Sequence, residues 1–211
     1  TLHGRKLVIG VDRLDYSKGI PERLRAFEQL LREHGDWRGA VTFIQISAPS
    51  REDVPEYQNL RRSVERLAGH INGRLGDADW TPVRYVNRSH NRKTLAGFYR
   101  LARVGLVTPL RDGMNLVAAE YVAAQDPEDP GVLMLSRFAG AAEALHGAVI
   151  VNPYDVDNTA AALNQALSMD IAERRERHQR LMASVRAHDI HHWRDGFLAA
   201  LDGEQPARAV A

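Results

Sequence analysis

Short apolar segments alternate with longer segments of helical periodicity along most of the chain. The apolar segments are rich in Val, Ile and Leu, which is typical of strands that are buried on both faces of a sheet. We therefore predict strands at residues 6–12, 41–46, 83–86, 104–107, 132–135 and 148–151.

The segments between these strands predict helices. Leu24, Phe27, Leu30 and Leu31 recur at helical spacing after Pro21, a residue that suits the first turn of a helix. The same spacing predicts helices at residues 57–71, 92–101 and 116–124, a short helix near 141–145, and a last amphipathic helix at 190–201.

The end of the chain continues as helix. Asp155 is placed to cap a helix after the last strand, and Asp170 with Glu173 has the spacing of a capping box. Strands separated by helices require right-handed crossovers and a mostly parallel sheet. The predicted fold class is therefore α/β, and ligands are expected outside the carboxyl ends of the strands.

Composition narrows the classes of function. Lys and Arg total 28 against 27 Asp and Glu, a formal net charge of +1, so we expect no nucleic-acid partner. No apolar run approaches the ~20 residues of a membrane span, and residues 1–6 carry no signal-peptide pattern. The chain has no cysteine, which excludes disulfides and cysteine metal sites. We predict a cytoplasmic protein with no membrane partner.

Two cations follow the first predicted strand. Arg13 and Lys18 lie in a loop that leads through Gly19 into a helix. A planar guanidinium and a mobile ammonium commonly converge on one phosphate, and the helix N-terminus adds positive potential. The alternative is an ordinary solvated loop.

A second polar loop follows the fourth predicted strand. Asp112 and Gly113 precede a helix whose first free N–H groups, at Asn115 to Val117, can bind an anion. Asp112 can accept hydrogen bonds from sugar hydroxyls, and Glu120, one turn into the helix, can reach a ribose diol. The alternative is a helix cap at Asp112 and a solvated glutamate at position 120.

Other strand ends repeat this chemistry. Arg51 follows the second strand, although a lone arginine there is more commonly a surface residue. Residues 87–92 carry two more cations and a histidine, and residues 136–141 form a small-residue turn. Cationic strand ends in a nearly neutral chain indicate a small phosphorylated ligand rather than a polymer.

Two patterns resemble metal sites. Asp77 and Asp79 match the DxD spacing of metal-dependent glycosyltransferases, but they lie in a predicted turn after a helix. His188, His191 and His192 have helical ligand spacing without an evident acidic or cysteine partner. We predict surface residues at both places, and neither a metal nor a cofactor.

Two long motifs resemble the trehalose-6-phosphate synthase family. They are GVDRLDYSKGIPERL at residues 10–24 and GLVTPLRDGMNLVAAEYVAAQ at residues 105–125. Shorter matches occupy 45–57, 72–82, 131–142 and 150–155, so that the resemblance extends to about Leu201.

The resemblance implies one half of a GT-B glycosyltransferase, with two Rossmann-like domains facing each other across a cleft. Residues 1–189 would be the Rossmann-like nucleotide-sugar-binding domain, and the N-terminal, acceptor-binding half would be absent. The helix within residues 190–202 would cross to that half, which predicts that Trp193 and Phe197 are partly uncovered. Residues 203–211 are expected to be a disordered tail.

The resemblance also implies roles for individual residues. The catalytic set would bind the donor diphosphate and glucose, and consists of Arg13, Lys18 and Asp112. The remaining donor-binding set would contact the glucose, phosphate, ribose and base, and consists of Ile46, His90, Gly113, Met114, Asn115, Leu116, Val117 and Glu120. Arg51 would hold the phosphate of the acceptor. The loop at Ser89 and His90 departs from the family's aromatic-containing loop. The resemblance therefore does not decide which nucleotide the site prefers, UDP, ADP or GDP.

The implied reaction transfers glucose from a nucleoside-diphosphate glucose such as UDP-glucose or ADP-glucose to glucose 6-phosphate. The product is α,α-trehalose 6-phosphate, with the configuration of the donor retained and without a metal. Alternatives are a related GT-B transferase with another acceptor, a sugar-phosphate sensor, and a plain interaction domain. The presence of Arg13, Lys18, Asp112 and Glu120 together argues against a sensor. The oligomeric state stays open, a homo-oligomer included.

Overall fold

The computed structural model describes residues 4–202, and the tail predicted at 203–211 lies outside this range. Its strands are β1 (Lys6–Arg13), β2 (Val41–Ala48), β3 (Val83–Val86), β4 (Val104–Val107), β5 (Val132–Ser136) and β6 (Val149–Val151). Its α-helices are α1 (Ile20–Glu33), α2 (Pro55–Leu75), α3 (Arg92–Leu101), α4 (Leu116–Ala124), α5 (Val156–Ser168), α6 (Ile171–Ala187) and α7 (Ile190–Leu201). The 3₁₀ turns are η1 (Tyr16–Lys18), η2 (Gly35–Trp37) and η3 (Gly140–Glu143).

The six strands form one parallel sheet in the order β3-β2-β1-β4-β5-β6. This confirms the α/β prediction. The chain builds outward from β1 to β3 on one side and then returns to place β4 on the other side of β1. In such sheets the crevice between the carboxyl ends of the two strands at this reversal is the usual ligand site. Here those strands are β1 and β4.

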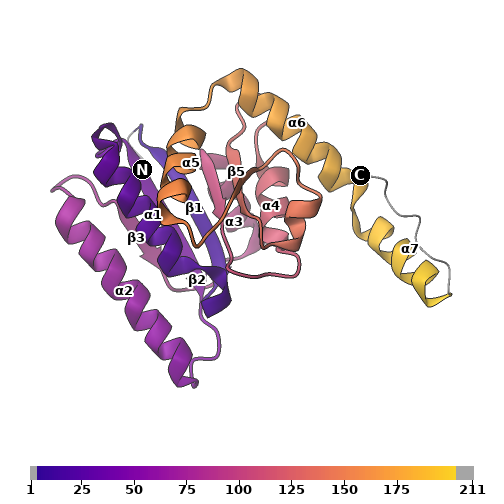
Figure 1. Cartoon of the computed structure of the whole chain (residues 1–211), viewed down its shortest axis with the longest axis horizontal. Helices are drawn as coiled ribbons and strands as arrows, with labels where there is room; N and C mark the ends of the chain where they lie inside the picture. Colours follow the sequence, from indigo (N-terminus) through magenta and orange to yellow (C-terminus); the bar gives the residue numbers. More distant parts are fainter. Residues whose placement is uncertain (1–3, 203–211) are drawn as a thin grey trace.

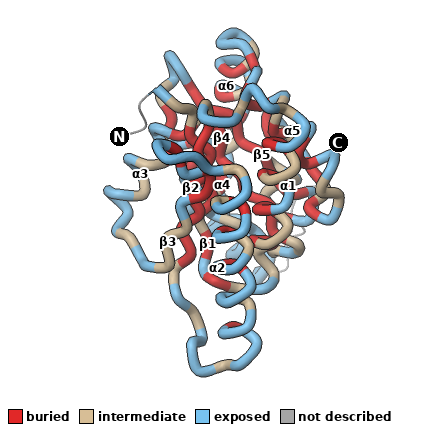
Figure 2. Tube along the Cα trace, turned by 90° about the vertical axis from the view of Figure 1, so that its left-hand side faces the viewer, coloured by how far each residue is buried: buried red, intermediate tan, exposed pale blue. Residues whose placement is uncertain are grey.

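Helices cover both faces of the sheet, and each face has its own apolar core. One core joins the strands to α1, α2 and α5 around residues such as Phe27, Val64 and Leu163. The other joins them to α3, α4 and α6 around Tyr121 and Leu181. Figure 2 shows the buried positions gathered along the strands, with exposed positions on the outer helices. The sheet is therefore buried on both sides, which explains why its strands are continuous apolar runs.

The structure differs from the sequence prediction mainly at element ends. β1 continues past its predicted end to Arg13 and β2 past its predicted end to Ala48, because these two residues stay in register with each other. The short helix predicted near 141–145 is the 3₁₀ turn η3, one residue earlier. Both predicted caps are confirmed. The carboxylate of Asp155 accepts from the N–H of Asn158 at 3.0 Å, and that of Asp170 accepts from the N–H of Glu173 at 2.9 Å.

The last helix, α7, packs little against the rest of the described chain. None of its residues is buried, and Trp193 and Phe197 are 56% and 51% exposed, with their rings stacked at 5.3 Å. This confirms that the two aromatic side chains are uncovered. A groove of about 780 Å³ lies between α7, the end of α6 and the first turn of α4. Figure 1 shows α7 standing apart from the sheet.

Candidate functional site

The loops after β1 and β4 are joined at the strand-order reversal. Asp15 begins the turn η1 by accepting hydrogen bonds from the N–H of Ser17 at 2.9 Å and its hydroxyl at 2.8 Å. The carbonyl of Ser17 accepts from the N–H of Leu110 in the second loop at 2.7 Å. Gly19 has φ +65°, and a Cβ there would lie 2.5 Å from the carbonyl oxygen of Thr108. Only glycine permits this approach of the two loops.

Lys18 and Asp112 form an ion pair across these loops. Lys18 Nζ lies 2.5 Å from Asp112 Oδ2, and the side chains are 14% and 18% exposed. Asn115 Nδ2 donates to the same oxygen at 3.1 Å. The alternative in which Asp112 caps the following helix is wrong, because Asn115 holds the N-cap position of α4, and within residues 4–202 that position has no side-chain cap hydrogen bond. The carboxylate of Asp112 is engaged by the ammonium and amide groups instead.

The N-terminus of α4 offers free backbone donors. Asn115 has φ +78°, a left-handed conformation that is uncommon outside glycine, and its Oδ1 is buried without a partner among residues 4–202. The helix begins at Leu116, so the N–H groups of Leu116 and Val117 belong to the first turn, where no intrahelical acceptor exists. Strain, free donors and the helix dipole together favour an anion at this position.

The loop after β5 supports the same site from beneath. The N–H of Asp112 donates to the carbonyl of Phe138 at 3.1 Å, and the N–H of Gly140 returns a bond to the carbonyl of Asp112 at 3.0 Å. A Cβ on Gly140 would lie 2.1 Å from the carbonyl oxygen of Gly113. Gly113 and Met114 are therefore held in a fixed, exposed loop at the mouth of the site.

Arg13 carries no ion pair among the described residues. It ends β1, opposite Ala48, and its side chain is exposed. The guanidinium has five N–H donors in a planar fork, a geometry that suits phosphate. Arg13 is thus available to a ligand at the edge where Lys18 is already paired.

Glu120 is an exposed residue of α4, and the two residues that the resemblance assigns to the base, Ile46 and His90, lie farther along the sheet. The hydroxyl of Tyr99 donates to Glu120 Oε2 at 3.5 Å, and burial together with that carboxylate raises the pKa of Tyr99. Ile46 is buried in β2, and His90 follows β3 with its ring 5.9 Å from that of Phe98. Both therefore belong to elements on the other side of β1 from the Lys18–Asp112 pair.

A buried polar network beneath the site was missed by the sequence prediction. Arg23 is 1% exposed, and its Nη1 donates to Asp12 Oδ2 at 2.6 Å and to Gln45 Oε1 at 2.9 Å. Its Nε donates to the hydroxyl of Thr108 at 3.0 Å, and its Nη2 donates to the carbonyl of Lys18 at 3.3 Å. One side chain thus ties the ends of β1, β2 and β4 to the turn that carries Lys18.

The sequence does carry a signal for this network. Arg23 interrupts the apolar face that Ile20, Leu24 and Phe27 form on α1, where a charged side chain needs a buried partner. Burial raises the pKa of the Asp12 carboxyl, although the Arg23 guanidinium opposes that shift. A Cβ at position 10 would lie 2.4 Å from the guanidinium, which explains the glycine in β1.

The two metal-like patterns occupy surface positions. Asp77 belongs to a turn closed on Trp80, and Asp79 pairs with Arg5 at 3.0 Å. His188 and His192 are exposed, with ring centroids 5.1 Å apart. Within residues 4–202 no cluster of three or more His, Cys, Asp or Glu has the arrangement of a metal site. Over the same residues, no helix combines the length and apolarity required to cross a membrane.

Comparison with known proteins gives a consistent result. A model of glycosyltransferase family 20 matches residues 1–203. A trehalose-6-phosphate synthase of Sinorhizobium fredii is 56% identical over 198 residues, which are 94% of this chain and 43% of that protein. A relative of the same description from Cronobacter sakazakii is 53% identical over 95% of this chain and 42% of that protein. The chain thus spans less than half the length of these relatives.

Solved structures agree with the fold. A crystal structure of an α,α-trehalose-phosphate synthase (UDP-forming) from Burkholderia xenovorans, in complex with glucose-6-phosphate, is 55% identical with a TM-score of 0.93. That match covers 95% of this chain and 44% of the other. A structure from E. coli bound with UDP-2-fluoro glucose is 50% identical with a TM-score of 0.93, covering 98% of this chain and 45% of the other.

Proposed function

Because this chain belongs to glycosyltransferase family 20, we propose that it forms the nucleotide-sugar-binding half of a retaining glucosyltransferase that makes α,α-trehalose 6-phosphate. The observation that carries the proposal is the meeting of Lys18, Asp112 and the N-terminus of α4, with Arg13 on the same edge; among residues 4–202 that helix end has no side-chain cap and Arg13 has no ion pair. This arrangement has the chemistry of a site for a phosphorylated sugar.

The proposed donor is UDP-glucose. Relatives that are 50% and 55% identical are described as UDP-forming or hold a UDP-glucose analogue, which supports uracil as the base. In this proposal Arg13 and Lys18 bind the diphosphate, and the N–H groups of Leu116 and Val117 add two donors. Asp112 accepts hydrogen bonds from the glucose.

The other donor contacts complete this assignment. The carboxylate of Glu120 binds the ribose hydroxyls, and the Tyr99 hydroxyl orients it. Gly113, Met114 and Asn115 form the loop around the glucose, while Ile46 and the backbone at His90 flank the base. The acceptor is glucose 6-phosphate, whose phosphate binds Arg51.

The proposed mechanism follows from where charge develops. A hydroxyl of the acceptor attacks the anomeric carbon on the face from which the diphosphate departs. The carbon–oxygen bond to the β-phosphate breaks, its electron pair leaves with UDP, and the departing phosphate oxygen takes the proton of the hydroxyl. Arg13, Lys18 and the α4 N-terminus stabilise the negative charge that accumulates on the leaving group. Arg13, Lys18 and this helix end thereby stabilise the charge that a divalent metal ion stabilises in other reactions of phosphates.

We propose further that residues 1–189 are the donor domain and that α7 docks on a second, acceptor-binding domain. The exposed Trp193 and Phe197 and the groove beside α4 support this arrangement, since together they leave an apolar surface next to the proposed donor site. A test must distinguish such a domain from a second copy of the chain, which is the other partner that this apolar surface can bind. The proposed location is the cytoplasm, because phosphorylated sugars are charged and do not cross membranes unaided.

Calorimetric titration with UDP, ADP and GDP tests the donor site. We expect saturable binding, tightest for UDP, which weakens at least about tenfold in Arg13→Ala, because a charge-assisted hydrogen bond contributes about 1.5–3 kcal/mol. The full-length protein should then form trehalose 6-phosphate from UDP-glucose and glucose 6-phosphate. If none of the nucleotides binds to a folded chain, the proposed donor site is contradicted. If the full-length protein forms a product other than trehalose 6-phosphate, the proposed acceptor is wrong.

A further inference from the structure

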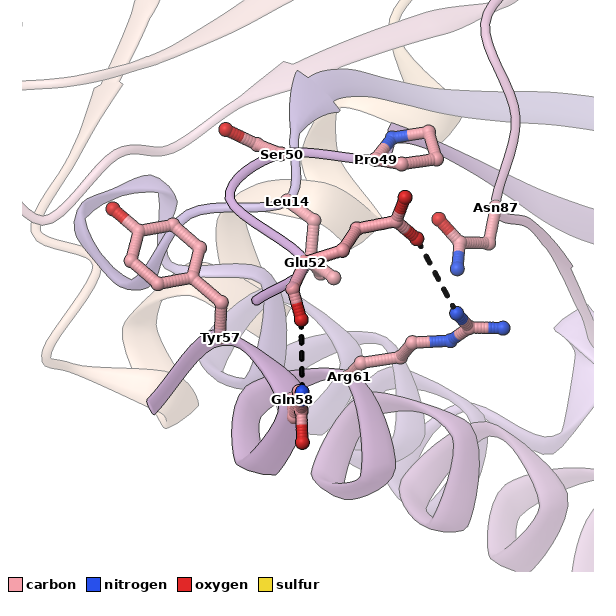
Figure 3. A pocket seen from close by; sticks show the side chains of 8 residues that line it. All are labelled: Leu14, Pro49, Ser50, Glu52, Tyr57, Gln58, Arg61 and Asn87. Atoms are coloured by element: carbon pink, nitrogen blue, oxygen red, sulfur yellow. Dashed lines mark hydrogen bonds and ion pairs between the residues drawn. The ribbon is translucent and has the colours of Figure 1, made fainter. Parts of the chain in front are cut away.

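The loop between β2 and α2 holds Arg51 in an unusual conformation. Arg51 has φ +48°, in the left-handed region that non-glycine residues rarely adopt. The helix fixes this loop at several points: Gln58 Nε2 donates to the carbonyl of Glu52 at 2.9 Å, and Arg61 pairs with the Glu52 carboxylate at 3.7 Å (Figure 3). The N–H of Val54 donates to the carbonyl of Arg51 at 3.0 Å. The surrounding contacts therefore maintain the strained residue.

Tyr57, in the first turns of α2, fixes the Arg51 side chain itself. Its hydroxyl accepts a hydrogen bond from Arg51 Nη1 at 3.1 Å, and its ring centroid lies 5.5 Å from the guanidinium carbon. The ring is 4% exposed and packs edge-on against Tyr16 at 5.8 Å. Arg51 is exposed and has no carboxylate partner among residues 4–202, so the rest of its planar fork faces outward with donors to spare.

The same hydroxyl reaches the loop after β1. It donates to Asp15 Oδ2 at 3.3 Å, while Asp15 Oδ1 accepts both hydrogen bonds from Ser17. Burial acts to raise the pKa of Asp15, but the hydrogen bonds from Ser17 and Tyr57 outweigh it, and the pKa lies below its usual value. Asp15 is thus a carboxylate that begins η1, the turn that ends at Lys18.

We propose that Tyr57 is a positioning residue that holds Arg51, the proposed acceptor-phosphate arginine, in fixed relation to the turn of Lys18. This inference rests on the proposed function. Two substrates react only when they are aligned, and a misplacement of about 1 Å can cost ~100-fold in rate. The hydrogen bonds from Arg51 to Tyr57 and from Tyr57 to Asp15 link the β2–α2 loop to the loop after β1, and both are made by the one hydroxyl of Tyr57.

Tyr57→Phe in the full-length protein tests the proposal. We expect the KM for glucose 6-phosphate to rise about tenfold, equivalent to about 1.4 kcal/mol, because Arg51 loses its fixed orientation. The Kd for UDP should stay within about twofold, because Asp15 keeps both hydrogen bonds from Ser17. An unchanged KM for glucose 6-phosphate would overturn the positioning role of Tyr57. A Kd for UDP that rises as much as this KM would overturn it as well.

Two further variants separate positioning from loss of stability. Tyr121→Phe is the matched control, because Tyr121 is also buried and its hydroxyl donates to the carbonyl of Ala102 at 3.0 Å, away from the site. Its KM for glucose 6-phosphate should not change. Adding Tyr57→Phe to Arg51→Ala should raise KM no further, because Tyr57 acts through Arg51. A further rise in the double variant, or an equal effect of Tyr121→Phe, would overturn the proposal.

The unmodified protein, measured in the same series, keeps the two proposals apart. If it neither binds UDP nor transfers glucose, the proposed function fails and this inference fails with it. If it does both while Tyr57→Phe behaves like the unmodified protein, only the role of Tyr57 is overturned.

Discussion

Replacing Arg23 by Met removes the centre of the buried network without removing its bulk. The Arg23 and Asp12 side chains are 0% and 2% exposed, so the Asp12 carboxylate would be left buried without its charge partner. Breaking such a pair typically costs about 3–5 kcal/mol, because the remaining ion cannot be solvated. For a domain of this size that corresponds to a fall in Tm of roughly 6–20 °C.

Urea unfolding of the chain, followed by circular dichroism, measures this cost. Arg25→Met on the same helix is the matched control. Arg25 is a half-exposed arginine whose pair with Glu22, at 3.2 Å, lies at the surface, and its loss should cost at most about 0.5 kcal/mol. Adding Asp12→Asn to Arg23→Met should recover part of the loss, since the uncompensated charge disappears. A cost below about 1 kcal/mol for Arg23→Met would refute the reasoning.

The pH dependence of the same variant follows from Asp12. Its pKa is raised by burial, and removing Arg23 removes the main opposing charge. A folded-state pKa above the unfolded value means that the folded chain favours the protonated acid. The stabilisation of the folded chain by protonated Asp12 is complete below the unfolded-state pKa of this residue. It is lost as the pH rises through the folded-state pKa. The deficit of Arg23→Met should therefore shrink as the pH is lowered from neutral, whereas that of Arg25→Met should not.

Three further predictions test the site and the last helix. In the full-length protein, Arg13→Ala and Lys18→Ala should each lower kcat at least about tenfold in steady-state assays, and an unchanged kcat in both would contradict their role at the leaving group. Gly140→Ala should weaken UDP binding measured by calorimetry, because its Cβ would lie 2.1 Å from the Gly113 carbonyl and force the loop to move; an equal Kd would mean that the loop can adjust. Trp193→Ala should barely change the urea midpoint of this chain, where the ring is half-exposed, but should cost about 3–5 kcal/mol in the full-length protein if α7 is covered there. Similar effects in both would argue against docking of α7.

The sequence predicts the fold well because the sheet is buried on both faces. Under that condition each strand is an apolar run, and all six predicted runs correspond to strands. The strand ends were harder to place, because Arg13, Ser47 and Ala48 lie beyond the predicted strands and nevertheless stay in the β1–β2 register. Local hydrophobicity does not report a pairing that the neighbouring strand imposes.

The site was predictable as a set of residue types but not as a geometry. Lys18 and Asp112 lie 94 residues apart, and their contact depends on strand order, which no local pattern gives. The left-handed backbone at Asn115 was equally hidden, since asparagine adopts many conformations. Arg23 could have been found, because a charge within an apolar helical face requires a partner, but the identity of its partners depends on the fold.

The short edge strands limit how this sheet can pair with a strand of another molecule. The central strands β1 and β2 have eight residues each, whereas the edge strands β3 and β6 have four and three. Short edges, with the exposed Arg84 on β3, give an incoming strand few hydrogen-bonding positions and a charge to bury. The sheet is thus poorly suited to extension by another chain or to strand exchange. Association through helical surfaces is therefore favoured, and α7 presents exposed apolar side chains at Trp193, Phe197 and Leu201.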